Sequence, residues 1–353
     1  MSSASSEDVR PARPGAFPSP DEVEVRAPSR VHITLIDMNG STGRRDGSVG
    51  FAVDEPGLRL SLSRGDTLRC EGTADAAQAA RVTSAIRHAA SALGVSEAVH
   101  ARLLGPVPAH CGLGSGTQLR LSALRGLAEL GGRTLSDREL VALSGRGGTS
   151  GIGVHAFSRG GFLVDGGHRV RDKGAFLPSR FAEGVPVPPL LYSRMPPEHW
   201  GVVLAVPAGV RGLEGAAEKD FMTRHTPLPL PAVQAVTHTV LMGLLPALEE
   251  GDLPAFGHCL TALQDIGWKQ AHWRREELRS WRPLLDLMCA QGAAGGGLSS
   301  TGPLVYAVYD RTVHHGAELA ERVRAGARRA GMRLTSLITT NFGRPAAVGH
   351  SEE

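Results

Sequence analysis

The sequence predicts an α+β fold in which strands and helices are segregated rather than strictly alternating. Three observations support this prediction. Polar and apolar residues alternate from residue 22, a glycine-rich loop at 112–116 leads into a helical apolar repeat, and helical patterns at about 214–290 precede a last helix and strand. A chain of 353 residues is long for one core, so we expect two closely packed domains.

The first half of the chain is expected to be mostly β. Residues 1–21 contain four prolines and few apolar side chains, which predicts a disordered arm. Strand patterns follow at 22–37, with a bend at Pro28, and at 50–53, 58–63, 67–71, 98–104 and 160–167. Helical patterns occupy 75–93 and 115–130.

The second half is expected to be richer in helix. Near residue 185 the composition changes to the proline-rich stretch GVPVPPLL, so the predicted domains are 22–185 and 186–350. Strand patterns lie at 200–207, 295–310 and 332–339, the second of them a glycine hairpin that leads into a buried strand. Helical patterns lie at 214–222, 231–249, 252–266, 273–290 and 314–329.

Bulk composition excludes several classes of protein. Hydrophobic residues make up 41% of the chain and charged residues 21%, as in an ordinary water-soluble domain. A formal net charge of +3 and the absence of a basic run argue against nucleic-acid binding. We find no secretory signal and no apolar run near the ~20 residues of a membrane span, and the four cysteines are widely spaced. We therefore expect a cytoplasmic protein with small-molecule partners, without nucleic-acid or membrane binding.

The stretch PAHCGLGSGTQLRLSALRGLAELGG, residues 108–132, carries the clearest chemical signal. Its glycines let backbone N–H groups turn towards one point without interference from a Cβ atom. The helix that follows, with Ser115 or Thr117 as a suitable N-cap, adds its dipole and its free N–H groups. Together they predict an anion site. A turn that merely joins strand to helix is the alternative, and the lysine of a GxxxxGK[ST] loop is absent.

Three motifs in order, PSRVHITLID, GLGSGTQ and GGGLSSTGP, resemble the signature of the GHMP kinase superfamily, which includes galacto-, homoserine and mevalonate kinases. GRGGTSGIGVHAF and GGFLVDGGH add a closer resemblance to the β-ribofuranosylaminobenzene 5′-phosphate synthases, and most of all to their relatives in C-nucleoside antibiotic synthesis of the formycin and pyrazofurin type. The resemblance spans about residues 25–345. It implies an N-terminal domain like domain 2 of ribosomal protein S5 and a ferredoxin-like C-terminal domain.

The resemblance also implies a phosphoribosyltransferase that forms a C–C glycosidic bond, with Mg²⁺ as cofactor and a homodimeric assembly. In such enzymes an aromatic acid attacks C1 of 5-phosphoribosyl-1-pyrophosphate (PRPP) through the ring carbon that bears its carboxylate. Pyrophosphate leaves, and carbon dioxide then leaves in place of a proton. The loop that would hold ATP phosphates in a kinase is expected to hold the pyrophosphate of PRPP and its Mg²⁺.

Three residues depart from the kinase pattern. Gly153 stands where mevalonate-type kinases carry a catalytic aspartate, Arg30 replaces a lysine, and Gly116 replaces one of two serines. Without the aspartate, no base is evident for an attacking hydroxyl. A coupling that ends in decarboxylation needs no such base, because its electrons come from the carboxylate.

The motif residues are assigned to subsites. For pyrophosphate we expect Gly112, Leu113, Gly114, Ser115, Gly116 and Thr117. For the ribose phosphate or the acceptor carboxylate we expect Arg30, Arg44, Arg45, Arg146, Gly147, Gly148, Thr149 and Ser150. His32 and Asp37 are the candidate catalytic residues, the aspartate as a stabiliser of an oxocarbenium-like state. Ser115 and Glu218 are the candidate Mg²⁺ ligands.

Each assignment has a plainer alternative. The GRGGTSG stretch is also typical of a tight turn, Asp37 of a loop cap, and His32 of a structural residue on its strand. Glu218 suits a solvated helix face. Lys269 is a further candidate for phosphate binding, and a lone surface lysine is its plainer alternative. Trp268 either walls an aromatic pocket or packs in the core.

Two classes of acceptor compete within the preferred function. C-nucleoside synthesis uses a carboxylated pyrazole, favoured here because only three lysines accompany many arginines, a coding bias that suits an actinomycete-like source. Methanopterin-type cofactor synthesis uses 4-aminobenzoate or 4-hydroxybenzoate. An ATP-dependent small-molecule kinase, disfavoured by Gly153, and a non-catalytic ligand sensor are the alternatives in other classes.

Overall fold

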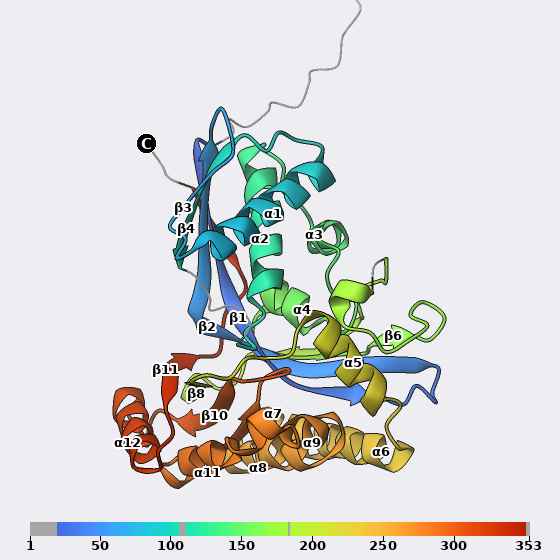
Figure 1. Ribbon diagram of the computed structural model, residues 1–353, viewed down its shortest axis with the longest axis vertical. Coiled ribbons are helices and arrows are strands. Elements are labelled where there is room, and N and C mark those ends of the chain that lie inside the picture. Colours follow the sequence, from blue (N-terminus) through green and yellow to red (C-terminus); the bar gives the residue numbers. More distant parts are fainter. Residues whose placement is uncertain (1–19, 106–110, 183, 351–353) are drawn as a thin grey trace, which may run out of the picture.

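The computed structural model describes residues 20–105, 111–182 and 184–350, so the predicted arm at 1–21 lies almost wholly outside the described residues. Two sheets organise the described chain, one of eight strands and one of four. Figure 1 shows α1 to α4 beside the larger sheet, and most helices of the second half packed beneath the smaller one. The protein is α+β, as predicted.

The larger sheet is built on two long strands, β1 (Glu22–Asp37) and β2 (Arg44–Arg64), which pair antiparallel. The segments expected at 50–53 and 58–63 are therefore parts of one strand. β1 runs through Pro28, where the register shifts between Ala27 and Ser29. The other strands are β3 (Arg69–Glu71), β4 (Val99–Gly105), β5 (Phe162–Asp165), β6 (His168–Arg169), β7 (Leu190–Arg194) and β12 (Ala347–His350).

The sheets divide the chain differently from the predicted domains 22–185 and 186–350. β7 pairs with β5 and β12 pairs with β1, so two strands from the second half complete the first sheet. Both were missed in the sequence. β7 follows directly on the proline-rich stretch, and β12 has only four residues, too few to show an alternating pattern.

Helices α1 (Ala76–Leu93), α2 (Ser115–Leu130), α3 (Asp137–Ser144) and α4 (Ile152–Arg159), with the short turn η1 (Ser179–Phe181), belong to the first half. α2 buries most of its apolar face in the main core. Gly126 allows this close approach, because a Cβ there would lie 2.7 Å from Leu62 Cδ1. The N-cap of α2 is Gly114 in the left-handed conformation, rather than Ser115 or Thr117 as expected.

The smaller sheet has the strand order β11-β8-β10-β9 and is antiparallel throughout. Its elements are β8 (Trp200–Pro207), β9 (Gly295–Leu298), β10 (Val305–Asp310), α12 (Gly316–Arg329) and β11 (Leu334–Asn341). With the helices between β8 and β9, the chain order is strand, helix, strand, strand, helix, strand. This is the ferredoxin-like arrangement expected for the C-terminal half.

The remaining helical elements lie between β8 and β9. They are α5 (Gly215–His225), α6 (Leu230–Thr239), η2 (Val240–Leu244), α7 (Leu245–Glu250), α8 (Leu253–Ala262), η3 (Leu263–Asp265), α9 (Gly267–Trp273), α10 (Glu276–Arg279) and α11 (Arg282–Ala290). α6, η2 and α7 form one helix, Leu230–Glu250, of 21 residues with a mean hydropathy of 1.3, long and apolar enough to cross a membrane by these two criteria. This differs from the expectation that the chain contains no such run. Core helices of water-soluble proteins meet the same criteria, so the finding is weak support for a membrane span.

Candidate active site

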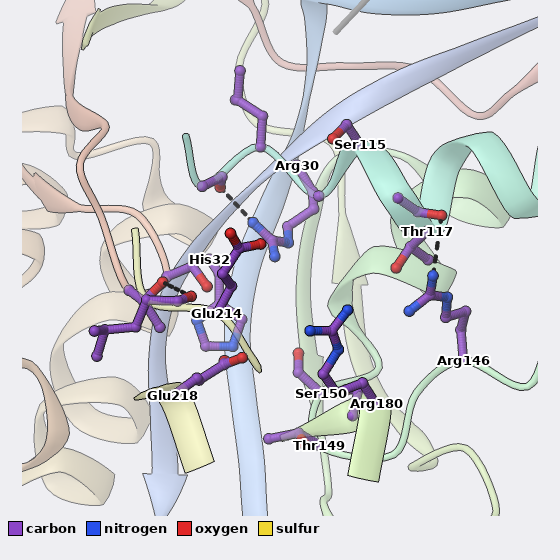
Figure 2. A pocket seen from close by; sticks show the side chains of 18 of the residues that line it. Arg30, His32, Ser115, Thr117, Arg146, Thr149, Ser150, Arg180, Glu214 and Glu218 are labelled. Carbon is purple, nitrogen blue, oxygen red and sulfur yellow. Dashed lines mark hydrogen bonds between the residues drawn. The ribbon is translucent and has the colours of Figure 1, made fainter. Parts of the chain in front are cut away.

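A cavity of about 690 Å³ lies where the three sequence motifs meet. Its wall combines residues of β1, α1, the glycine loop at 112–117, the loop before α4, the turn η1, helices α5 and α9, and the loop at 300–302. Figure 2 shows Thr117 and Arg146 on one side of this cavity, and His32, Glu214 and Glu218 on the other.

The glycine loop places the start of α2 at the cavity wall. Gly112 and Gly114 have φ angles of 100° and 75°, which side chains rarely adopt. Thr117 and Gln118 N–H groups turn back to the Gly114 carbonyl. Within the described residues, the N–H groups of the first two α2 residues, Ser115 and Gly116, make no hydrogen bond, so they can bind an anion.

The three motifs converge on a single carbonyl group, that of Gly112. Arg30 Nη1 from β1 donates to it, and so does Ser299 Oγ, at 2.7 Å, from the GGGLSSTGP motif. Ser299 Oγ also accepts the His32 N–H at 3.0 Å. Arg30 N–H donates to Leu113 O at 3.0 Å. The backbone of the glycine loop is therefore held by both of the other motifs.

Arg30 carries its charge into a buried position. Burial lowers its pKa to about 10, while Cys111 and Glu218 oppose the shift, so the guanidinium stays protonated at neutral pH. A Cβ at Gly114 would lie 2.9 Å from Arg30 Cγ, which shows how closely the two segments pack. Gly116 differs, because a Cβ there would meet nothing nearer than Arg146 Nη2 at 3.7 Å. Within the protein itself, close packing therefore requires glycine at Gly114 but not at Gly116.

Further arginines surround the start of α2. Arg81 Nη2 donates to Ser115 Oγ at 3.1 Å, and Arg146 Nη2 to Gly116 O at 3.5 Å. Burial, together with the positive charges of Arg120 and Arg180, lowers the pKa of Arg146 to about 10. Within the part of the chain that the structure describes, no carboxylate lies within salt-bridge distance of these four arginines. This end of the cavity is built for an anion.

Three of these arginines, Arg81, Arg120 and Arg180, were not predicted. Arg81 lies in the alanine-rich helix α1, and Arg120 lies among the apolar residues of α2, where an arginine normally marks a solvated face. Arg180 lies in the turn η1, which the sequence pattern did not reveal. The only signal in the sequence is that Arg120 follows the glycine loop by one helical turn.

The loop at 145–151 contributes two hydroxyl residues to the cavity, Thr149 and Ser150. Gly147 and Gly148, assigned to phosphate or carboxylate binding, do not line it. A Cβ at Gly147 would lie 2.8 Å from Val187 Cγ2, and one at Gly148 2.8 Å from Ala182. These two glycines instead allow the loop to pack against Ala182 and Val187.

Three other predicted site residues also lie outside the cavity lining. Asp37 Oδ1 accepts the N–H groups of Asn39 and Gly40, both at 2.8 Å, so Asp37 caps a loop. Arg44 donates to Gly166 O and Gly167 O, each at 2.7 Å. Arg45 lies over a phenylalanine ring, 4.8 Å from its centre. Each of these side chains makes its contacts with loop segments near the β1–β2 turn and not with the cavity.

His32 lines the cavity, and Lys269 lies behind it. Burial, with the charges of Arg30 and Lys269, lowers the pKa of His32 well below 6.5, so the ring is neutral. Lys269 is fully buried, whereas the sequence suggested a surface position. Its Nζ donates to Leu298 O at 2.6 Å and Ser300 O at 2.8 Å, so it fixes the glycine hairpin and is not free for a phosphate.

The end of the cavity opposite Arg146 is apolar and acidic. Leu35, Met222 and Trp268 line it and belong to one buried cluster. Glu218 lies one helical turn before Met222, so both side chains face the same way. Burial raises the pKa of Glu218 to about 7, although the charges of Arg180 and Arg30 oppose the shift. Glu218 is thus a cavity carboxylate rather than part of a solvated helix face.

The oxygen-bearing side chains of the cavity could bind a Mg²⁺ ion through few protein ligands, but they do not form a site made of protein ligands alone. No group of three or more histidine, cysteine, aspartate or glutamate side chains close enough for a metal occurs among the described residues. Mg²⁺ is commonly bound through one or two carboxylates together with water and substrate phosphates. Glu218 fits that role. Ser115 fits it less well, because the Arg81 guanidinium already occupies its Oγ.

Gly153 lies on the first turn of α4, against the start of α2. A Cβ there would lie 3.3 Å from Thr117 Cγ2, and the Gly153 carbonyl accepts a hydrogen bond from Gln118 Nε2 at 2.8 Å. A carboxylate at this position would point towards the first turn of α2. The glycine removes negative charge from the place where an anion is expected to bind.

Comparison with known proteins agrees with this geometry. Residues 80–161 match the family model "GHMP kinases N terminal domain". Similar solved structures include homoserine kinase from Cytophaga hutchinsonii (TM-score 0.65, 17% identity, covering 93% of this chain and 97% of that one) and L. major mevalonate kinase (TM-score 0.64, 15% identity, covering 94% and 100%). The fold is therefore that of the GHMP kinases.

Curated relatives define the family more narrowly. The beta-ribofuranosylphenol 5'-phosphate synthase of Methanothermobacter thermautotrophicus is 40% identical over 82% of this chain and 89% of its own length. The enzymes of the same name from Archaeoglobus fulgidus and Methanocaldococcus jannaschii are 39% and 34% identical, over 82% and 81% of this chain and 88% and 89% of their own lengths. The chain belongs to the beta-ribofuranosylphenol 5'-phosphate synthase family. These relatives give no support to the narrower resemblance to C-nucleoside antibiotic enzymes.

Proposed function

We propose that the protein is a PRPP-dependent C-glycoside synthase, which joins C1 of phosphoribose to an aromatic acid and releases pyrophosphate and carbon dioxide. One observation carries the proposal. Among the described residues, the start of α2 offers N–H groups without a hydrogen-bond partner between half-buried arginines, while Gly153 leaves no carboxylate there to activate a hydroxyl. This is an arrangement for stabilising a departing anion rather than for phosphoryl transfer.

The favoured acceptor is a para-substituted benzoate, 4-hydroxybenzoate first and 4-aminobenzoate second. The names of three relatives at 34–40% identity describe a ribofuranosylphenol product, which supports a phenol-forming acceptor. The coding bias that favoured a carboxylated pyrazole concerns the source of the gene and not the cavity. Trp268, Leu35 and Met222 give this end of the cavity an apolar wall, which suits an aromatic ring of either kind.

The two ends of the cavity are proposed to divide the substrates between them. The glycine loop, Arg81 and Arg146 hold the phosphates of PRPP, and the apolar end around Trp268 receives the acceptor ring. Glu218, on the side of the cavity opposite Arg146 and within reach of the charges of Arg30 and Arg180, holds Mg²⁺ together with pyrophosphate oxygens. When bound, Mg²⁺ supplies positive charge that stabilises the leaving pyrophosphate.

Within this scheme, the chain's own residues orient C1 and withdraw charge. The Ser115 and Gly116 N–H groups, at the positive end of the α2 dipole, stabilise charge that builds on pyrophosphate as the bond to C1 breaks. His32 is neutral and adds no positive charge near the oxocarbenium-like C1. Asp37 has no part in the scheme, because its carboxylate caps a loop.

The test is incubation of the purified protein with PRPP, Mg²⁺ and single acids from a panel, with pyrophosphate, carbon dioxide and coupled product measured together. We expect equimolar release with 4-hydroxybenzoate, and weaker or no release with 4-aminobenzoate and a pyrazole dicarboxylate. Preference for the pyrazole would reverse the proposed acceptor. Phosphoryl transfer from ATP to an alcohol would point to a kinase, and PRPP binding without turnover to a ligand sensor.

We also propose a cytoplasmic homodimer. Leu230, Leu241 and Met242 expose 41%, 57% and 64% of their surface along the helix Leu230–Glu250, an apolar stripe that a second copy would cover. Light scattering after size-exclusion chromatography should give twice the 37.1 kDa mass of one chain. Leu241→Glu should then give a monomer of unchanged fold, and a monomeric wild-type protein would contradict the proposal.

A further inference from the structure

A buried aspartate is connected to the cavity through two serine hydroxyls. Ser150, in the loop before α4, lines the cavity, and its Oγ lies 2.6 Å from Ser48 Oγ of β2. Ser48 Oγ donates to Asp165 Oδ2 at the end of β5. Asp165 is fully buried, and its carboxylate also accepts the N–H groups of Gly151 at 2.8 Å and Gly167 at 2.9 Å. One line of hydrogen bonds therefore runs from the cavity to a carboxylate.

The direction of these hydrogen bonds determines what Ser150 offers to a ligand. A carboxylate accepts only, so the Ser48 proton is used on Asp165, and Ser48 accepts the Ser150 proton in turn. Ser150 Oγ also accepts the Ile152 N–H at 3.2 Å. Towards the cavity Ser150 therefore presents a lone pair. A phosphate or carboxylate is unsuited to that position, whereas a ligand hydroxyl that donates a proton fits it.

We propose that Ser150, Ser48 and Asp165 form a proton relay that takes the phenolic proton of a 4-hydroxybenzoate-type acceptor and later returns it. This proposal rests on the proposed function and adds a catalytic role to it. Asp165 supplies, from β5, the basic group that is missing at Gly153. Burial also raises the pKa of Asp165 above that of an ordinary aspartate, which makes its carboxylate a stronger base.

The step balances without any further reactant. As the phenolic proton moves to Ser150, the Ser150 proton moves to Ser48 and the Ser48 proton to Asp165. The phenolate electron pair drives the carboxylate-bearing ring carbon onto C1, and the bond from C1 to pyrophosphate breaks with its electrons on pyrophosphate. The bond to the carboxylate then breaks, its electron pair restores the aromatic phenolate, and carbon dioxide leaves. The relay returns the proton to the phenolate oxygen.

Two other titratable groups at the cavity, His32 and Glu218, suit this role less well. His32 lies beside Arg30 and Lys269, and these charges and its burial keep it from taking up a proton. Glu218 has a pKa of about 7, but it faces Arg30 and Arg180 and is the proposed Mg²⁺ ligand. Glu218→Gln is therefore the matched control. It removes a cavity carboxylate that is proposed to act on PRPP, so it should affect the two acceptors equally.

The experiment compares two acceptors that differ in phenol acidity. 4-Hydroxybenzoate must lose its phenolic proton, whereas 3,5-difluoro-4-hydroxybenzoate is already ionised at neutral pH because fluorine acidifies the phenol. General-base catalysis is typically worth ~10²–10⁴-fold, so Ser150→Ala and Ser48→Ala should each lower kcat for 4-hydroxybenzoate by about that factor. Turnover of the difluoro acceptor should change less than roughly tenfold. Ser150→Thr, which keeps the hydroxyl, should restore most of the turnover.

The possible outcomes distinguish a proton relay from a purely structural role of the two serines. PRPP affinity and melting temperature identify variants that are misfolded. If the variants misfold, the relay is tested on the wild-type enzyme instead. Its solvent deuterium isotope effect should be larger for 4-hydroxybenzoate than for the difluoro acceptor. Equal losses with both acceptors, or equal isotope effects, overturn the relay and leave the structural role. An acceptor-selective loss in Glu218→Gln alone also overturns it. A wild-type enzyme that couples neither benzoate overturns the proposed acceptor class, and the relay with it.

Discussion

At one end of the cavity the groups proposed to bind substrate are main-chain N–H groups from the start of α2, and at the other end they are side chains from β1, α5 and α9. The groups at the first end belong to one short segment, the glycine loop and the start of α2, and arginines from other segments surround it. The second joins Leu35, Met222 and Trp268, which are far apart in the sequence. A main-chain anion site can be found from its glycine spacing, whereas a side-chain acceptor site exists only once the chain has folded.

The largest expected effect on activity comes from substituting a glycine at the main-chain end, and a second glycine there serves as the comparison. Gly114→Ala forces a side chain into a φ of 75° and to within 2.9 Å of Arg30, which displaces the N–H groups. Loss of an oxyanion-type donor typically costs ~10²–10³-fold in rate, and we expect that loss in kcat/KM for PRPP. Gly116→Ala has open space and should lose less than about tenfold. Equal losses for the two variants would show that steric fit is not what selects glycine here.

A smaller effect is expected from the arginines that surround the same end. Arg146→Ala removes a hydrogen-bonding charge worth about 1.5–3 kcal/mol, so KM for PRPP should rise by roughly 10–150-fold. Arg44→Ala is the matched control, because Arg44 donates to Gly166 O and Gly167 O outside the cavity. It should lower the melting temperature and leave KM unchanged. A raised KM for PRPP in Arg44→Ala would show that Arg44 contributes to PRPP binding after all.

Trp268→Phe tests the side-chain end. The substitution keeps an aromatic ring but reduces the apolar face at the cavity, where an aromatic contact is worth about 0.5–1.5 kcal/mol. We expect KM for the aromatic acid to rise by roughly 2–10-fold, with the Kd of PRPP unaltered in calorimetry. A change in the Kd of PRPP alone would place PRPP, and not the acceptor, against the tryptophan.

The smallest effect concerns the pH dependence of stability. The pKa of Glu218 is raised from 4.5 to about 7, so the folded state holds this proton more tightly than the unfolded state does. Its contribution to stability is therefore lost as the pH rises from about 4.5 to about 7, and the penalty is complete at pH 8. Glu218→Gln should melt roughly 2–5 °C higher than the wild-type protein at pH 8, with little difference at pH 5. An equal shift at both pH values would assign the effect to packing.

The predicted site residues that reach the cavity are those with a local cause. Gly112, Gly114 and Ser115 were assigned to a pyrophosphate site from glycine spacing and a helix start, and the structure places them in the cavity lining. Arg30 and His32 reach the cavity because alternate residues of a strand share one face.

The parts that were missed or misplaced depend on long-range packing. Asp37, Arg44 and Arg45 follow Arg30 closely in the sequence, but the β1–β2 turn directs them to loops beyond the cavity. Lys269 was assigned to the surface, because a helical pattern does not show which other segment covers it. The relay residue Asp165 gave no signal, since an aspartate after a strand normally marks a turn.

The shared carbonyl of Gly112 has a consequence for how this enzyme changes over evolution or in the laboratory. Arg30 and Ser299 both donate to that carbonyl, from segments far apart in the chain. A substitution in either one alters the environment in which the other was selected, so their effects should be epistatic rather than additive. A glycine loop transplanted from a kinase of this fold would arrive without its two donors. Swaps between such enzymes should therefore transfer Arg30, the loop and Ser299 as one unit.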